Sequence, residues 1–161
     1  MKRFLNISVI GAGLMGHGIA LKFAQFGKNI NVYDTNLESL NSLPKRIKIS
    51  MKQMGVSDLE INKTQKFISV SNDLEKSVAN ADFVIEAIPE KLEIKQEMFS
   101  LIEGFVSPKC IISSNTSVIP ITKIVHRVKD KSRCLGTHWW NPPHLIPLVE
   151  VIKTKWTKEI V

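Results

Sequence analysis

The sequence predicts an α/β fold in which helices cover both faces of a doubly wound, mostly parallel β-sheet. Short apolar runs alternate along the chain with longer segments whose apolar residues recur at helical spacing. Most of these runs, such as residues 7–10, are rich in apolar residues, as strands buried on both faces are. A glycine-rich turn follows the first run and opens the first helical segment, which is typical of Rossmann-type folds.

The expected strands are short and are separated by turns or helices. They cover residues 7–10, 30–34, 66–70, 83–87, 110–113, 133–138 and 148–152. The expected helices cover residues 14–26, 37–54, 73–79, 93–105 and 121–128. The helix over 93–105 has the clearest periodicity. Its expected buried face consists of Ile94, Met98, Leu101, Ile102 and Phe105.

Glycine, asparagine and proline mark where these helices begin and end. Gly27 has the usual C-terminal position of the first helix, and Asn36 can cap the second. Pro44 must kink the second helix or divide it in two, because proline lacks the N–H that a helix interior needs. Pro120 suits the first turn of the last helix.

The last two strands differ from the others in their connection. Only nine residues lie between His138 and Leu148, and three of them are proline. A parallel connection needs about a dozen residues or more. We therefore expect the last two strands to pair antiparallel at the edge of the sheet. Pro142, Pro143 and Pro147 should make the loop between them stiff.

Length and composition indicate a globular chain. The 161 residues are 43% hydrophobic and 23% charged, with a mean hydropathy of +0.01. We expect one domain over residues 1–161, with no membrane contact, since no apolar run approaches about 20 residues. Cys110 and Cys134 lack metal-ligand spacing, so we interpret them as buried thiols in a reducing, cytoplasmic compartment, with no metal site.

The net charge of +7 leaves two interpretations open. The lysines are scattered, mixed with acids and not interleaved with aromatic residues, which argues against a nucleic-acid partner. The charge then belongs either to an ordinary solvated surface or to a site that attracts a polyanionic small molecule such as a nucleotide.

The glycine-rich turn predicts a dinucleotide-binding site. It consists of Gly11, Ala12, Gly13, Leu14, Met15 and Gly16. The first glycine permits the tight turn, the second lets the backbone approach a pyrophosphate, and the third allows close helix–strand packing. The helix that follows presents its N-terminus to the anion.

Asp34 favours NAD as the cofactor. It ends the second expected strand, 18 positions after Gly16. A carboxylate there accepts hydrogen bonds from a ribose diol and repels the 2′-phosphate of NADP, and no arginine follows it closely. The alternative is that Asp34 only caps the next helix.

Polar side chains after two further strands are candidates for ligand contacts. The segment SSNTS, residues 113–117, follows the fifth strand, where ligands of α/β sheets bind. Its hydroxyls and the amide of Asn115 can hydrogen-bond a substrate oxygen, or they merely cap the next helix. After the fourth strand, Glu90 and Lys95 either line the cofactor or start a helix with suitable charges.

Together these motifs resemble the NAD-binding domain of the L-3-hydroxyacyl-CoA dehydrogenase family. The resemblance rests on VIGAGLMGHGIA, DFVIEAIPEKLEIK, SSNTSVIPI and GTHWWNPPHLIPLVEVI, and covers essentially the whole chain. It implies an NAD-dependent oxidoreductase of fatty-acid β-oxidation that transfers hydride from the 3-hydroxyl carbon of an acyl-CoA.

The resemblance also implies roles for individual residues. His138 would be the general acid/base, Glu150 would orient it, and Ser117 would contact substrate and nicotinamide. Positions that contact the cofactor are matched by Glu90, Lys95 and Asn141. Ser50 matches a family position near coenzyme A.

The chemistry supports these residue types independently. Taking a hydride from an alcohol requires removal of the hydroxyl proton, and histidine titrates closest to neutral pH. A carboxylate on the other ring nitrogen fixes the tautomer and stabilises the imidazolium that forms.

Two departures from the family keep alternatives open. The turn WWNPPHLIPLVEV also resembles the branch that acts on gulonate and carnitine. The family continues into a helical domain that supplies dimer contacts and the far wall of the substrate cleft, whereas this sequence stops at Val161. We expect either the N-terminal half of a dehydrogenase that is homodimeric at full length, or an NAD-binding module without turnover.

Overall fold

The chain forms a seven-stranded sheet in the computed structural model, which describes residues 4–159. The strands are β1 (Asn6–Ile10), β2 (Asn29–Tyr33), β3 (Ile68–Ser71), β4 (Phe83–Glu86), β5 (Ile111–Ser114), β6 (Cys134–Trp139) and β7 (Val149–Ile152). Their order is β3-β2-β1-β4-β5-β6-β7. Every neighbouring pair is parallel except β6 and β7, which are antiparallel. This order and direction define a doubly wound, Rossmann-type sheet.

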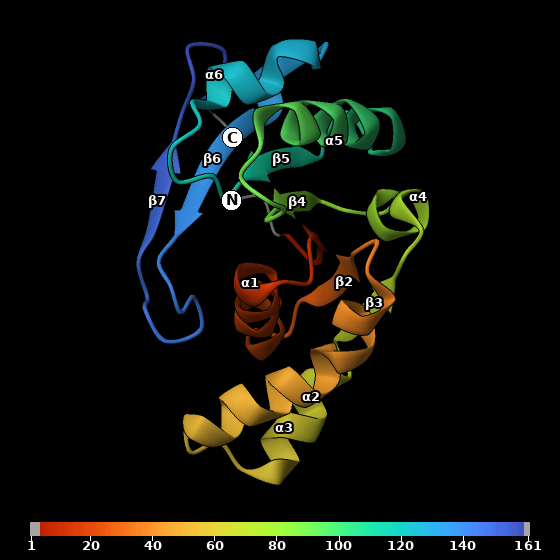
Figure 1. Cartoon of the computed structure of the whole chain (residues 1–161), viewed down its shortest axis with the longest axis vertical. Helices are drawn as coiled ribbons and strands as arrows, with labels where there is room; N and C mark the ends of the chain where they lie inside the picture. Colours follow the sequence, from red (N-terminus) through yellow and green to blue (C-terminus); the bar gives the residue numbers. More distant parts are fainter. Residues whose placement is uncertain (1–3, 160–161) are drawn as a thin grey trace.

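Helices cover both faces of the sheet (Figure 1). One face carries α1 (Leu14–Gln25), α2 (Leu37–Gln53) and α3 (Asp58–Gln65). The other carries α4 (Leu74–Val78), α5 (Leu92–Phe105) and α6 (Ile121–Ile124). Short 3₁₀ segments follow over Val125–Arg127 and Lys131–Arg133.

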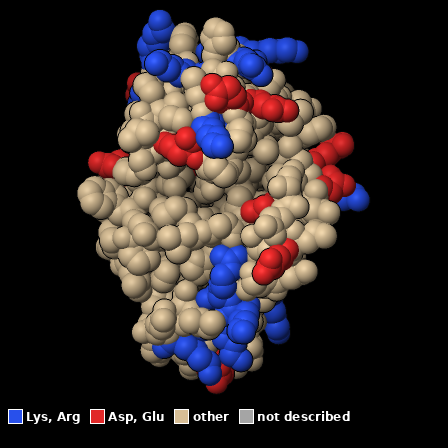
Figure 2. Space-filling view, in the orientation of Figure 1, with Lys and Arg blue, Asp and Glu red and all other residues tan. Residues whose placement is uncertain are grey.

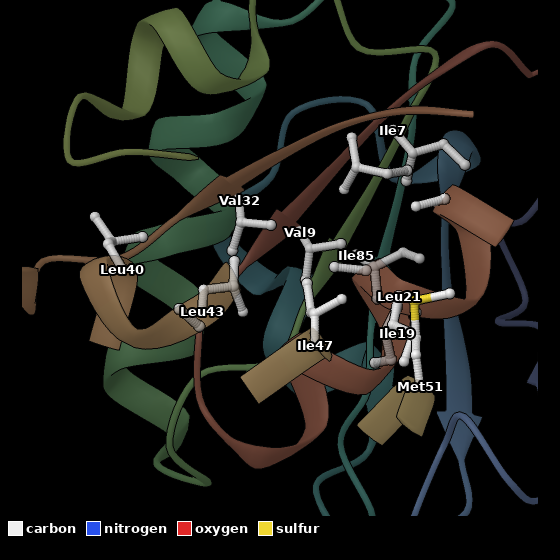
Figure 3. Close-up of a cluster of buried hydrophobic side chains, with 14 of the residues drawn as sticks. Ile7, Val9, Ile19, Leu21, Val32, Leu40, Leu43, Ile47, Met51 and Ile85 are labelled. Atoms are coloured by element: carbon white, nitrogen blue, oxygen red, sulfur yellow. The ribbon is translucent and has the colours of Figure 1, made fainter. Parts of the chain in front are cut away.

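Each face has its own hydrophobic core. Adjacent residues of one strand contribute to different cores, because successive side chains of a strand point to opposite faces. In β4, Val84 belongs to the α5 side and Ile85 to the α1 side. Figure 3 shows the α1 side, where Val9 and Val32 of the sheet pack close to Ile47 of α2.

The structure confirms most of the expected elements. The strands begin and end within two residues of the predicted positions. Gly27 ends α1 with a φ of +66°, and the Asn36 side chain caps α2 by accepting a bond from the Ser39 N–H at 3.0 Å. The antiparallel β6–β7 pair at the sheet edge is also as predicted.

Pro44 does not divide the second helix in two, which was one of the two outcomes expected of it. This proline lies inside α2, yet the helix runs without a break over Leu37–Gln53. Pro44 is exposed, while the opposite face is held in the core by Leu40, Leu43, Ile47 and Met51. Packing of that face keeps the helix whole, although proline removes one of its internal hydrogen bonds.

Helix α3 was not predicted. Its sequence, DLEINKTQ, buries only Ile61 and Thr64, so it lacks a clear apolar period. The signal that could have found it is local: the Ser57 side chain caps it by accepting from the Glu60 N–H at 3.3 Å.

The predicted buried face of α5 was largely wrong. Ile94, Leu101 and Phe105 are 40%, 44% and 37% exposed. Ile102 is buried at 0%, as predicted, and the buried face is completed by Lys95 at 1% and Phe99 at 0%. The helix is rotated from the expected orientation because Lys95, a residue that periodicity counts as polar, points inward to buried acids.

Two glycines test the packing of the sheet against its helices. A Cβ at Gly16 would lie 1.7 Å from the Gly11 carbonyl oxygen, whereas a Cβ at Gly104 of α5 would meet nothing within 4 Å. Gly16→Ala should therefore lower the free energy of unfolding by at least about 1–3 kcal/mol through overpacking. Gly104→Ala should raise it by up to about 1 kcal/mol, because alanine favours the helix.

Urea denaturation of both variants beside the unaltered chain measures the two effects. An unchanged or increased stability of Gly16→Ala would contradict the close approach of the turn to α1.

Candidate functional site

The predicted motifs meet at the carboxyl ends of the parallel strands. Because β1, β4, β5 and β6 are parallel, the residues that follow them come together at their carboxyl ends. The glycine-rich turn lies after β1, Glu90 lies after β4, Asn115 follows β5, and His138 is near the end of β6.

The glycine-rich turn has the geometry of an anion-binding turn. Gly11 has a φ of +106°, and a Cβ there would lie 2.6 Å from the Ala87 carbonyl oxygen. A Cβ at Gly13 would meet nothing within 4 Å, so the second glycine faces open space. Helix α1 begins at the next residue without a side-chain cap or an acid in its first turn. Its N-terminal N–H groups can therefore receive a phosphate.

Asp34 joins this turn to the start of α2. It lies one residue beyond β2, not at its last position as predicted. Its Oδ2 accepts from the Ala12 N–H at 2.7 Å, and its Oδ1 accepts from the Asn36 N–H at 2.8 Å. The N-cap of α2 is Asn36. Asp34 is thus held beside the glycine-rich turn.

A pocket of about 600 Å³ opens between the glycine-rich turn and the segment that joins β2 to α2. Its walls are formed by Gly11, Gly13, Leu14, Met15, Tyr33, Asp34, Thr35, Asn36, Ser39, Ala87, Ile88, Pro89, Ile94 and Met98. The last residues give it an apolar side, which explains why Ile94 of α5 is exposed. An apolar wall opposite a carboxylate suits a flat base attached to a ribose.

Arg46 is a residue of this region that sequence reasoning missed. From α2 its Nη2 donates to the Ala12 carbonyl at 2.6 Å and to the Ser39 carbonyl at 2.8 Å. Its Nη1 donates to the Gly13 carbonyl at 3.4 Å. No arginine follows Asp34 closely in sequence, but Arg46 lies on the same face of α2 as Ser39, and its long side chain reaches back over two turns to the Ser39 carbonyl.

A second group of residues lies around His138. The β6–β7 register places His138 directly opposite Glu150. The His138 Nδ1 and the Glu150 Oε2 are 2.6 Å apart, and the His138 Nε2 and the Ser117 Oγ are 3.2 Å apart. The predicted catalytic residues are therefore together, with the imidazole between a carboxylate and a hydroxyl.

The segment with Ser117 is fixed by Glu90. One carboxylate oxygen of Glu90 accepts from the N–H groups of Ser117 at 3.0 Å and Val118 at 3.2 Å, and from the Thr116 hydroxyl. Burial by itself would raise the pKa of Glu90, but the bonds from Thr116, Lys95 and Val118 outweigh it and lower the pKa to about 2. Glu90 is therefore an anion at any physiological pH.

Lys95 and Glu86 form a buried ion pair beneath this segment. The Lys95 Nζ lies 2.6 Å from Glu86 and 3.1 Å from Glu90. The Ser114 hydroxyl donates to the other Glu86 oxygen at 2.6 Å. Burial raises the pKa of Glu86, while Lys95 and Ser114 oppose that rise. Lys95 faces the two acids rather than the pocket, and Glu86 was not predicted at all.

The remaining predicted residues lie apart from the pocket walls. Asn115 accepts from the Trp139 N–H through its Oδ1 at 2.9 Å and so ties the end of β5 to β6. Asn141 is exposed in the loop that follows β6. The Ser50 hydroxyl is buried and lies 2.9 Å from the His17 Nε2, so it is not open to a ligand.

The loop between β6 and β7 packs on α1 through an unpredicted contact. A Cβ at Gly18 would lie 2.6 Å from the Pro143 Cγ, so only glycine permits this approach. Beside it, the His17 and His144 rings are 5.4 Å apart in an edge-on arrangement. These contacts hold the loop that connects His138 to Glu150.

The open glycine-rich turn, the carboxylate beside it and the strand order define a dinucleotide-binding domain. The chain belongs to the 3-hydroxyacyl-CoA dehydrogenase family. Its residues 6–161 match the pattern described as "3-hydroxyacyl-CoA dehydrogenase, NAD binding domain". The cofactor of this family's domain is NAD, as predicted.

Known proteins similar to the chain agree with this. The mitochondrial hydroxyacyl-coenzyme A dehydrogenase of Rattus norvegicus is 36% identical over 96% of the chain and 52% of its own length. A 5-formyl-3-hydroxy-2-methylpyridine 4-carboxylate 5-dehydrogenase of Mesorhizobium japonicum is 32% identical over 91% and 48%. The crystal structure of 3-hydroxybutyryl-CoA dehydrogenase from Escherichia coli K12 superposes with a TM-score of 0.91. Its sequence is 31% identical, and the match covers 99% of the chain and 34% of the length of the Escherichia coli protein.

The chain spans about half the length of the first two relatives. Over residues 4–159, no helix has the length and apolar character needed to cross a bilayer. A cytoplasmic location stays a prediction, since the rat relative is named mitochondrial and one from Brassica napus glyoxysomal.

The buried histidine of α1 predicts a pH dependence of stability. Burial lowers the pKa of His17 below its ordinary 6.5, and the charges of Arg46 and His144 lower it further, against a rise from the Leu14 carbonyl. The unfolded chain then binds more protons than the folded one below pH 6.5. The free energy of unfolding should be highest above that pH and fall by at most about 1.4 kcal/mol per pH unit for this group as the pH drops.

Urea denaturation between pH 7.5 and 5.5 measures this effect. His17→Asn should reduce the fall, whereas His126→Asn, at an exposed position, should leave it unchanged. His144 adds to the fall in both variants, because burial and Lys22 lower its pKa too. Equal falls in the unaltered chain and His17→Asn would show that His17 does not titrate as described.

Proposed function

We propose that the chain is the NAD-binding, acid/base part of a dehydrogenase that interconverts L-3-hydroxyacyl-CoA and 3-ketoacyl-CoA. One observation carries the proposal: His138 lies between Glu150 and Ser117, at the same sheet edge as the cofactor turn. Residues 1–161 would form one NAD-binding domain, and the family's helical domain would close the substrate cleft and pair the subunits.

In this proposal the first half of the site binds the cofactor. The N-terminus of α1 and the turn around Gly13 receive the pyrophosphate. Asp34 accepts hydrogen bonds from the adenosine ribose, and its charge disfavours the 2′-phosphate of NADP. When bound, the nicotinamide supplies a hydride acceptor. Glu90, Lys95 and Asn141 act on the cofactor side, Lys95 through its ion pair with Glu90.

The second half of the site transfers the proton. Glu150 accepts a hydrogen bond from the Nδ1–H of His138, which leaves the Nε2 lone pair directed at Ser117. A substrate hydroxyl that replaces the present Ser117 contact gives its proton to Nε2 as the C–H hydride leaves. The imidazolium that results is stabilised by Glu150. In the reverse direction Nε2 returns the proton to the ketone oxygen.

The substrate has one specific alternative. The rat relative is named for hydroxyacyl-coenzyme A, whereas the Mesorhizobium relative is named for a substituted pyridine carboxylate. The same acid/base pair can therefore serve a hydroxyl compound without coenzyme A, such as a hydroxy acid of the gulonate or carnitine kind. The other alternative is an NAD-binding module without turnover.

Oxidation of NADH in the presence of acetoacetyl-CoA tests the proposal. A chain in which a helical domain of the family follows residue 161 should turn over, while residues 1–161 alone should be nearly inert. The reason is that positioning the substrate can supply roughly 7–11 kcal/mol of the barrier. His138→Gln and Glu150→Gln in the longer chain should lower kcat by about 10²–10⁴-fold for the histidine and less for the glutamate.

His126→Gln is the matched control, because this histidine is exposed on the 3₁₀ segment away from the site. Full activity of His138→Gln would contradict its role as the proton donor. Reduction of NAD⁺ with gulonate or carnitine, together with no oxidation of NADH by acetoacetyl-CoA, would keep the acid/base pair and replace the substrate. No turnover with any of them would favour the binding module.

A further inference from the structure

We propose that Arg46 is a specificity-determining residue of the cofactor pocket. Its guanidinium offsets the charge of Asp34, and it is placed to bind the 2′-phosphate of NADP once that carboxylate is removed. This inference rests on the proposed function, since it requires Asp34 to be the ribose ligand. It goes beyond that function by assigning a latent NADP site to a residue outside the glycine-rich motif.

The contacts of Arg46 place its charge at the ribose end of the pocket. The guanidinium bridges the glycine-rich turn and the first turn of α2, through the carbonyls of Ala12, Gly13 and Ser39. Gly13 and Ser39 are themselves pocket walls. Asp34 is bonded to the same two segments, through the N–H groups of Ala12 and Asn36. Arg46 therefore lies behind the walls formed by Gly13 and Ser39, next to the segments that hold Asp34.

The charge of Arg46 is not neutralised by a direct partner. All its acceptors are neutral oxygens: three backbone carbonyls and the Ser42 hydroxyl, at 3.3 Å from Nε. Over the part of the chain that the structure describes, no ion pair involves Arg46. Burial lowers its pKa and the charge of Asp34 raises it. Asp34 is the acid that balances Arg46.

Arg46 also keeps hydrogen-bonding capacity for a ligand. A guanidinium has five N–H donors, and four bonds to protein acceptors are present. The bond from Nη1 to Gly13 is long at 3.4 Å, so Nη1 has the weakest hold on the protein. The side chain is half-buried, so part of it remains accessible. The remaining N–H of Nη1 can donate to a phosphate oxygen, and exchange of the long Gly13 bond would supply a second donor.

The surroundings add to the positive potential. Figure 2 shows Lys and Arg gathered over the lower part of the molecule, where Figure 1 places α2 and α3. In α2, Lys45, Lys48 and Lys52 are exposed. With Asp34 present, the negative and positive charges at this end of the pocket balance, and it accepts a ribose diol. Without Asp34, it is cationic and suits a ribose phosphate.

Binding of NADH and NADPH to residues 1–161 tests this, with the fluorescence of the bound nicotinamide as the readout. The unaltered chain should prefer NADH. Asp34→Ala should weaken NADH binding about tenfold or more and tighten NADPH binding, so that the preference inverts. In the Asp34→Ala background, Arg46→Met should weaken NADPH binding about tenfold or more beyond any weakening of NADH binding. Arg46→Lys should keep part of the NADPH gain.

Lys45→Met in the Asp34→Ala background is the matched control, since it removes one exposed charge of the same helix and should change NADPH binding little. Equal NADPH affinity of Asp34→Ala with and without Arg46→Met would overturn the role of Arg46. NADH binding by Asp34→Ala as tight as by the unaltered chain would instead overturn the ribose site, and with it that part of the proposed function.

A spectroscopic measurement covers the case in which Arg46→Met does not fold. The arginines of the chain are Arg3, Arg46, Arg127 and Arg133, so side-chain ¹⁵N resonances are few. The Nε signal of Arg46 is identified as the one that is absent from the spectrum of Arg46→Lys. In Asp34→Ala, NADPH should shift this signal, and NADH should shift it much less. Equal shifts with both cofactors would overturn the proposal.

Discussion

The ion pair between Lys95 and Glu86 is the contact on which the arrangement of the site depends. Both charges are fully buried, and removing two charges from water costs several kcal/mol each. The pair is therefore not a source of stability in itself. It joins the end of β4 to α5 and, through Ser114 and Glu90, to the segment after β5. Its geometry orients α5 and places Ser117.

The strands of the sheet position the two halves of the site. The parallel strands bring the glycine-rich turn, Glu90 and Asn115 to one edge, where α1 begins. The antiparallel strand β7 then supplies what a parallel strand could not. It returns along β6 so that Glu150 lies opposite His138. The contact of Pro143 with Gly18 fixes the connecting loop against the cofactor-binding helix.

Elements governed by local sequence could be predicted, while contacts between distant side chains could not. Apolar runs and glycine spacing indicated the strands and the turn, because short loops leave few ways to connect them. The acid/base pair was indicated by the resemblance to the family. Arg46 meets Ala12 across 34 positions and His17 meets Ser50 across 33, so no local pattern shows them. The orientation of α5 failed because a buried lysine contradicts hydrophobic periodicity.

The central claim is that Glu150 fixes the tautomer of His138, so that Nε2 faces the substrate as the proton-accepting atom. Ring ¹⁵N chemical shifts of His138 test it most directly, in residues 1–161 at a pH where the imidazole is neutral. We expect a proton on Nδ1 and none on Nε2, and a shift of that proton toward Nε2 in Glu150→Gln. A proton on Nε2 in the unaltered chain would contradict this role of Glu150.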